Sequence, residues 1–177
     1  AAPAAADTVI AGRVAVTSAT ATITITAEQD VLFGAGGDLV GMGGTITVTA
    51  DTRAGNNGGG ITMSNGTTVA AADGLIDFDA DGNISLGQLT TSNTTDTAAT
   101  ITTTSGSILD ITAAETSNIT AGTTVLRAAT GIGNAAVDAE DIDISVDSLA
   151  ATTATGDISI SDAANLDITT VDGLSGV

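Results

Sequence analysis

The sequence contains no cysteine, no histidine and no lysine among its 177 residues. Without cysteine the chain can form neither disulfides nor thiolate metal sites. Without all three residue types, the familiar nucleophile–base pairs of covalent catalysis cannot be built. Paired aspartates can cleave glycosides, but such grooves also use aromatic platforms and cations, which are almost absent from this chain. The sequence therefore predicts a protein that is not an enzyme and that requires no cofactor.

Positive charge is scarce as well. The only cations are Arg13, Arg53 and Arg127, against 21 acidic residues, which gives a formal net charge of −18. A nucleic-acid-binding protein needs basic residues to neutralise phosphates, and a protein that binds anionic membranes needs the same. We therefore expect no nucleic-acid partner. The acidic surface should instead attract divalent cations and basic surfaces.

Long apolar runs are missing, although the mean hydropathy is +0.38. No stretch of about 18 apolar residues is present, so we expect no transmembrane helix and no membrane insertion. The opening string AAPAAAD lacks the basic region and the apolar core of an intact signal peptide. Residues 1–10 are expected to form an alanine-rich N-terminal segment or linker. It is either the remnant of a processing site or an arbitrary boundary inside a longer chain.

What the chain has in abundance is strict alternation of apolar and polar residues. Residues 20–26 (TATITIT) and 45–49 (TITVT) alternate at every position, and shorter stretches follow to the end of the chain. A period of two predicts half-buried β-strands, which Thr and Ile favour. With two Phe and neither Trp nor Tyr, the core must be built from Ile, Val, Leu and Ala. Such a core suits the narrow lumen of a solenoid.

A phrase of glycine followed by alternating residues recurs, starting at Gly44, Gly60, Gly82 and Gly156. Successive inward isoleucines are 15 to 25 residues apart, and self-similarity at roughly 20 residues is typical of a solenoid. We therefore predict an all-β fold over residues 11–177, a single domain that forms a right-handed parallel β-helix of about eight or nine coils. The alternative is a β-sandwich or jelly roll, which also has short alternating strands. It explains neither the lack of aromatic filler nor the repeated phrase.

Several longer strings resemble a known family. The strings at 20–39 (TATITITAEQDVLFGAGGDL), 43–69, 82–110, 125–133 and 155–177 resemble the repeat region of large filamentous-haemagglutinin-like adhesins. The resemblance covers most of the chain after about residue 10, and it rests on the joined order of phrases. It implies a secreted right-handed parallel β-helix that forms a cell-surface rod, exported by a partner transporter or a similar route. It implies no catalytic residues. Since the family's recognisable secretion domain is missing, the chain looks like an interior repeat or a repeat-derived unit.

One acidic motif suggests a metal site. Asp77, Asp79 and Asp81 match positions 1, 3 and 5 of an EF-hand-type calcium loop, and the glycine at position 6 is present. Position 12 is Gln88, where a bidentate Glu is wanted, and the flanking residues indicate strands. The alternative is therefore a strand that turns after Asp81. The candidate ligands for calcium are Asp77, Asp79, Asp81 and Asn83.

A second acidic group comprises Asp138, Glu140, Asp141, Asp143 and Asp147. Alternation places Asp141, Asp143 and Asp147 on one face of a strand. This face is either simply solvated or a weak, general binding surface for calcium. Equivalent positions on neighbouring coils stack about 4.8 Å apart, so carboxylates there repel one another and bound cations would relieve the repulsion.

The function expected from these patterns is a non-enzymatic extracellular structural or adhesive rod, one repeat or subunit of a cell-surface adhesin or fibre. One alternative is a self-assembling extracellular filament subunit that stacks end to end or donates a strand from residues 1–26. Another is a solenoid that binds ice or a mineral through ranks of outward threonines such as Thr22, Thr24 and Thr26. Because an open coil is an exposed strand edge, we expect copies of the chain or adjacent repeats as partners. A cell-surface or matrix ligand is also expected.

Overall fold

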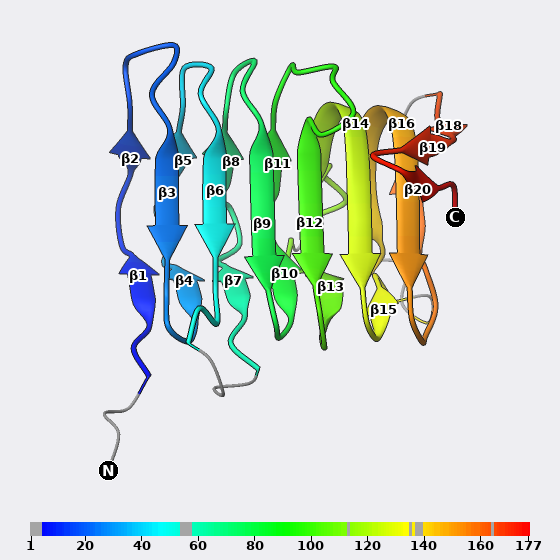
Figure 1. Cartoon of the computed structure of the whole chain (residues 1–177), viewed down its shortest axis with the longest axis horizontal. Helices are drawn as coiled ribbons and strands as arrows, with labels where there is room; N and C mark the ends of the chain where they lie inside the picture. The colour runs from blue at the N-terminus through cyan, green and yellow to red at the C-terminus, as the bar shows by residue number, and fades with distance from the viewer. Residues whose placement is uncertain (1–4, 54–57, 113, 135, 137–139, 164) are drawn as a thin grey trace.

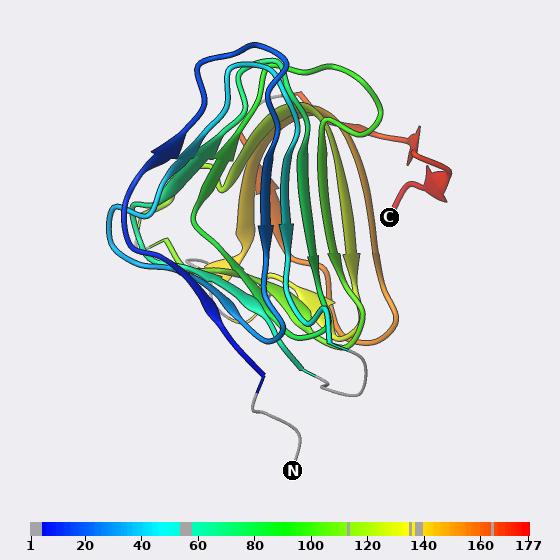
Figure 2. The same ribbon diagram turned by 60° about the vertical axis from the view of Figure 1, so that its left-hand side comes forward.

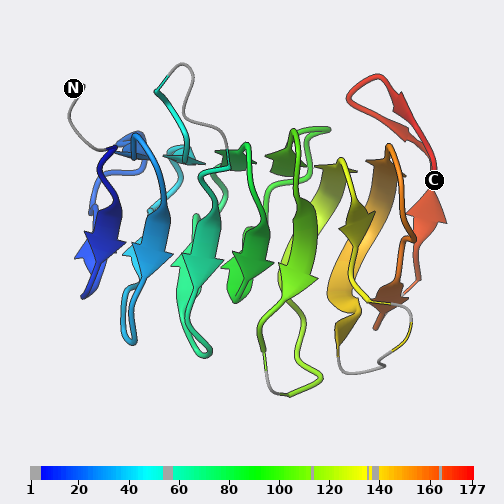
Figure 3. The same cartoon turned by 90° about the horizontal axis from the view of Figure 1, so that it is seen from below.

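The computed structural model describes residues 5–53, 58–112, 114–134, 136, 140–163 and 165–177. Short β-strands dominate this part of the chain, which contains no α-helix. The strands lie side by side in chain order along one rod (Figures 1 and 3). Within the same residues no helix is long and apolar enough to cross a membrane.

Each coil contributes strands to three faces of the rod, which enclose a lumen (Figure 2). Face A consists of β1 (Thr8–Ile10), β4 (Val31–Phe33), β7 (Ile61–Met63), β10 (Ile84–Leu86), β13 (Ser107–Asp110) and β15 (Gly131–Ile132). Face B begins with β2 (Val14–Ala15), β5 (Leu39–Val40), β8 (Thr68–Ala70) and β11 (Gln88–Thr90). Face C begins with β3 (Ile23–Thr26), β6 (Ile46–Thr49), β9 (Ile76–Ala80) and β12 (Ala99–Thr103). The long strands β14 (Ile119–Ala128) and β16 (Ile142–Thr153) run on from face B to face C.

The chain winds as a right-handed parallel β-helix, as predicted. Strands of face C run downward at the front of Figure 1, the chain returns upward behind them, and successive coils advance to the right. Neighbouring strands on all three faces pair in parallel, for example β6 with β9 and β9 with β12. A β-sandwich or jelly roll needs antiparallel neighbours, and in the described part of the chain only β19 (Thr170–Val171) and β20 (Leu174–Ser175) pair that way. This alternative is therefore wrong.

The described residues form six complete coils and part of a seventh, fewer than the predicted eight or nine. On face A, Thr8 pairs with Val31, a step of 23 residues, and Val31 pairs with Ile61, a step of 30. The predicted spacing was too short because it treated inward isoleucines of different faces as one series. Ile61 lies on face A and Ile76 on face C of the same coil. The first described strand, β1, begins at Thr8, within residues 1–10, which were expected to form an alanine-rich N-terminal segment or linker.

Inward side chains form continuous apolar rows along the lumen. One row on face C contains Ile25, Val48, Phe78, Ile101, Leu126 and Ala151, which are register partners in successive coils. Phe78 also stacks on Phe33 of face A, with ring centroids 6.3 Å apart. The two Phe thus meet across the lumen between the second and third coils, while Ile, Val, Leu and Ala fill most of the rest.

Some threonines lie inside the coil rather than on its outer faces. Thr103 is buried, and its hydroxyl donates to the carbonyl oxygen of Gly82 (2.5 Å) in the preceding coil. The hydroxyl of Thr91 likewise donates to the carbonyl oxygen of Gly74 (2.6 Å). Corner carbonyls that lie outside a strand ladder need such donors, because an unpaired buried carbonyl costs stability. These two threonines therefore satisfy backbone carbonyls where the chain turns.

The two ends of the rod differ. At the C-terminal end, β17 (Ile160–Asp162) and β18 (Asp167–Ile168) pair with β16, and the β19–β20 hairpin then folds back over face C (Figure 1). At the N-terminal end, β1, β2 and β3 stand last in their sheets. Within the described residues each of them pairs with the next coil only. On their other edges the described residues supply no strand partner, although the carbonyl oxygen of Thr26 accepts a hydrogen bond from the hydroxyl of Thr8 (2.8 Å).

Candidate functional site

The outer side of face C carries two ranks of side chains that change along the rod. The first rank contains Thr24, Thr47, Asp77, Thr100 and Val125. The second contains Thr26, Thr49, Asp79, Thr102 and Arg127. The threonine ranks are thus interrupted by two carboxylates on β9 and again at β14, after which the first rank continues with Ala150 and the second with Thr152 on β16. The strands of this face are regularly spaced, but the outward side chains they present vary from coil to coil.

The C-terminal hairpin covers the end of this face. Its turn consists of Asp172 and Gly173, with φ angles of 49° and 71°. This is the type I′ geometry that Asp-Gly favours in two-residue hairpins. Val171 is only 2% exposed because it packs on outward side chains of β14 and β16, Val125 among them. Nη2 of Arg127 lies 3.1 Å from Oδ2 of Asp172 and holds the turn in place.

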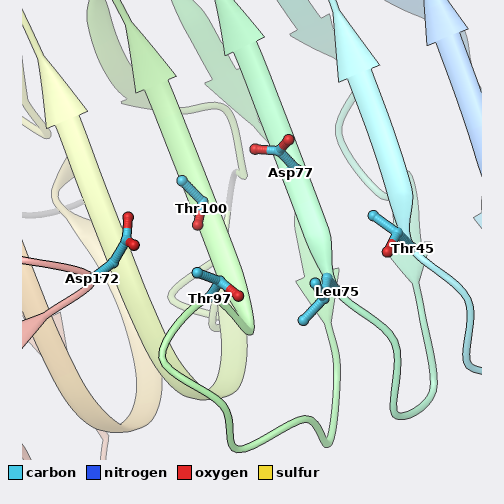
Figure 4. Close-up of a pocket in the computed structure, with 6 residues that line it drawn as sticks. All are labelled: Thr45, Leu75, Asp77, Thr97, Thr100 and Asp172. Atoms are coloured by element: carbon cyan, nitrogen blue, oxygen red, sulfur yellow. The ribbon is translucent and has the colours of Figure 1, made fainter.

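A half-open groove of about 270 Å³ lies beside the hairpin turn on face C (Figure 4). Its lining residues are Thr45, Leu75, Asp77, Thr97, Thr100 and Asp172. Asp77 and Asp172 stand on opposite sides of Thr97 and Thr100 (Figure 4). The groove thus combines two carboxylates, three hydroxyls and one leucine. None of the described residues that line it is basic.

The two carboxylates of the groove differ in their electrostatic state. Burial raises the pKa of Asp77, and the charge of Asp79, two residues along β9, raises it further. No hydrogen bond or ion pair from the described residues reaches the Asp77 carboxylate. Asp172, by contrast, is paired with Arg127. Asp77 therefore carries an uncompensated, partly desolvated negative charge, which a bound cation would stabilise.

The predicted calcium ligands occupy a strand and the turn that follows it. Asp77 and Asp79 point outward from β9, and burial raises the pKa of Asp79 as well. Asp81 accepts a hydrogen bond from the backbone N–H of Gly58 (2.8 Å). No three acidic side chains of this described stretch bring their ligand atoms within 4.8 Å of one another. Calcium at Asp77, Asp79, Asp81 and Asn83 stays a prediction.

The last two of these residues connect neighbouring coils. The hydroxyl of Thr104 donates to Asp81, and this hydrogen bond is the main reason why the pKa of Asp81 is lowered. Oδ1 of Asn83 accepts from the backbone N–H of Ser107 (2.9 Å). Both side chains thus cap backbone or hydroxyl donors of adjacent coils, which is a structural role the EF-hand comparison does not suggest.

A second set of carboxylates meets at the corner before face B. Ligand atoms of Glu115, Asp141 and Asp143 all lie within 4.8 Å of one another, and one oxygen of Asp141 is buried without a hydrogen-bond partner. The sequence pattern grouped Asp141 and Asp143 but not Glu115, which comes from the preceding coil. Asp147 is exposed, whereas Asp138, of the same predicted group, lies outside the described residues.

The groove was not predicted from the sequence, although one signal for it was present. Asp172-Gly173 between apolar residues is a strong sign of a hairpin, and it marks the segment that folds back over face C. Which strand this hairpin covers depends on tertiary packing, so no local pattern places Asp172 near Asp77. Comparison of the chain with protein-family models, with curated proteins and with solved structures finds no match.

Proposed function

We propose that this chain is a segment of a non-enzymatic extracellular rod, structural or adhesive in role, that continues coil on coil with a neighbour. The observation that supports the proposal most strongly is the open N-terminal end. There the strand edges of β1, β2 and β3 lack partners within the described residues. The inward side chains Val16 and Ile25 are only partly buried by the described residues.

The C-terminal end offers a matching surface. Ile158, Ile160 and Leu166 belong to the last partial coil and are also only partly buried. Ile168 is 60% exposed. Exposed parallel strand edges over an apolar lumen are a template for further strands. The neighbour is either another coil of a longer polypeptide or a second copy stacked end to end.

The extracellular and cell-surface location rests on the resemblance to filamentous-haemagglutinin-like adhesins. The parallel β-helix agrees with the architecture that the resemblance implies. A non-enzymatic role is supported by the composition, since the sequence has no histidine, cysteine or lysine for nucleophile–base chemistry. Ligand specificity of an adhesive rod would then depend on side chains of its outer faces.

End-to-end association is tested with a matched pair of variants in β3. Ile25→Lys places a charge at the open lumen, whereas Thr24→Lys places the same charge on the outer side of the same strand, where Thr24 is exposed. We expect the native chain to form linear oligomers in sedimentation velocity and negative-stain microscopy. Ile25→Lys should abolish them and Thr24→Lys should retain them. A native chain that stays monomeric at its highest soluble concentration would contradict self-assembly.

The size of the native polypeptide distinguishes the two kinds of neighbour. A band near 16.9 kDa on a denaturing gel of the source material would identify a free-standing subunit. A band several times larger would identify a repeat within a longer rod. Surface labelling of intact source cells, followed by detection of this sequence, tests the proposed location. Label confined to lysed cells would contradict it.

A further inference from the structure

Size and lining make the face-C groove a site for a single side chain. Pockets for drug-sized ligands and cofactors enclose about 300–1,000 Å³, and this groove encloses about 270 Å³. Leu75 gives it an apolar wall beside the threonines Thr45, Thr97 and Thr100. Such a wall suits a methylene chain that ends in a polar group.

Charge determines which polar group fits. The groove presents Asp77 and Asp172 and, among its described lining residues, no cation. Arg127 already neutralises Asp172, so Asp77 is the carboxylate that gains most from a ligand. The formal net charge of −18 repels anionic ligands and steers cationic ones toward the surface.

We propose that this groove binds the cationic end of a basic side chain presented by a partner protein. The ammonium or guanidinium group pairs with Asp77 and donates hydrogen bonds to the hydroxyl oxygens of Thr97 and Thr100. The methylene stem lies along Leu75, as the stems of Lys and Arg do on other apolar surfaces. Because Asp172 is fixed by Arg127 and by its tight turn, the far wall of the groove is formed before the ligand arrives.

The partner is a different protein because this chain has few cations to offer. It contains no lysine, and Arg53 and Arg127 form ion pairs with Glu28 and Asp172. Arg13 lies between β1 and β2, on other faces of the rod. The inference deepens the adhesive part of the proposed function and rests on it, but it does not depend on end-to-end assembly.

The test is a titration of the full 177-residue chain, followed by the backbone amide signals of Thr97, Thr100 and Asp172 in NMR spectra. The probes are Nα-acetyl-lysine methylamide, the corresponding arginine derivative, and the uncharged norleucine derivative of similar shape. We expect saturable shifts with the lysine or arginine probe and none with norleucine. Equal shifts with norleucine, or no saturable shift with either basic probe, would overturn the proposal.

Asp77→Asn and Asp79→Asn form the matched pair for this experiment. Both remove one charge from β9, but only Asp77 lines the groove. We expect Asp77→Asn to weaken binding by on the order of fivefold, and Asp79→Asn by less than about twofold. If both variants lost the same affinity for the probe, the probe would be attracted by the overall negative charge of the surface, and the proposed site would be overturned. Normal far-ultraviolet circular dichroism and unfolding of both variants ensure that a loss reflects the groove.

Two further measurements distinguish binding of a partner protein from self-association of this chain and from end-to-end assembly. The amide signals of the groove are also recorded at increasing concentrations of the chain alone. If they shift with concentration in the native chain but not in Arg13→Gln, the occupant is a second copy of this chain, which overturns the partner-protein proposal. Ile25→Lys and Thr24→Lys leave the groove unaltered. Failure of assembly and failure of lysine binding are therefore observed separately.

Discussion

The two sides of β9 differ in chemistry, because one side lines the apolar lumen and the other carries the outer carboxylates. Ile76, Phe78 and Ala80 point into the lumen, while Asp77 and Asp79 point outward from the same five-residue strand. Most inward positions are apolar in successive coils, and buried threonines such as Thr103 and Thr124 are the exceptions. Outward positions change from threonine to aspartate to valine or arginine along face C. The lumen therefore specifies the fold, and local departures on the outer face, such as Asp77, line the groove.

The sharpest way to test this division is to truncate one residue from each side of β9. Phe78→Ala removes the ring that stacks on Phe33 and leaves a cavity in the lumen, so we expect a loss of about 3–5 kcal/mol of unfolding free energy. Asp79→Ala removes a side chain of similar position on the outer side and should cost little or nothing. Urea unfolding measures both. Similar losses in the two variants would show that the outer rank is structural as well.

Substitution of corner glycines should cause the next largest loss of unfolding free energy, because adjacent coils approach closely at the corners. A Cβ at Gly106 would lie 2.4 Å from the backbone carbon of Gly82 in the preceding coil, whereas nothing lies within 4 Å of a Cβ at Gly12. We expect Gly106→Ala to cost about 1–3 kcal/mol through overpacking. Gly12→Ala should be neutral or slightly stabilising. Unfolding curves that rank the two variants in the opposite order would contradict the contact between coils.

The lumen was predictable because its signal is local. Alternation such as Thr45-Ile46-Thr47-Val48 determines which side chains point inward, and the lack of large aromatics indicates a narrow interior. The number of coils was not predictable from the same pattern. Corner loops vary in length, and β14 passes from face B to face C with no loop at all. An isoleucine therefore does not reveal on which face it lies.

The candidate site was only partly predictable for a related reason. Asp77 was singled out from its spacing to Asp79 and Asp81, but the EF-hand pattern grouped it with neighbours in sequence. In the structure its neighbours are Thr47 and Thr100 from adjacent coils and Asp172 from the returning hairpin. In a solenoid the residues that share a surface are about one coil apart in sequence. Local motifs therefore miss them.

The smallest expected effect concerns the pH dependence of outer carboxylates. Burial raises the pKa of Asp77 above 3.8, its value in an unstructured chain, and the charge of Asp79 adds to the shift. Between 3.8 and the raised pKa, the folded state binds more protons than the unfolded chain. The unfolding free energy therefore increases as the pH falls through this window, and the charged form costs stability at neutral pH. Because Asp77 is partly solvated, this cost is small.

Asp77→Asn should therefore stabilise the chain slightly at neutral pH, and the difference from the native chain should vanish below the unfolded pKa. The pH dependence expected for Asp81 has the opposite sign, because the hydrogen bond from Thr104 lowers its pKa. Its stabilising contribution is present above 3.8 and is lost as the pH falls toward the lowered pKa, so Asp81→Asn should destabilise the chain at neutral pH. Urea unfolding at neutral and acidic pH measures both differences. If both variants shifted in the same direction at neutral pH, net charge rather than local environment would govern the outer face.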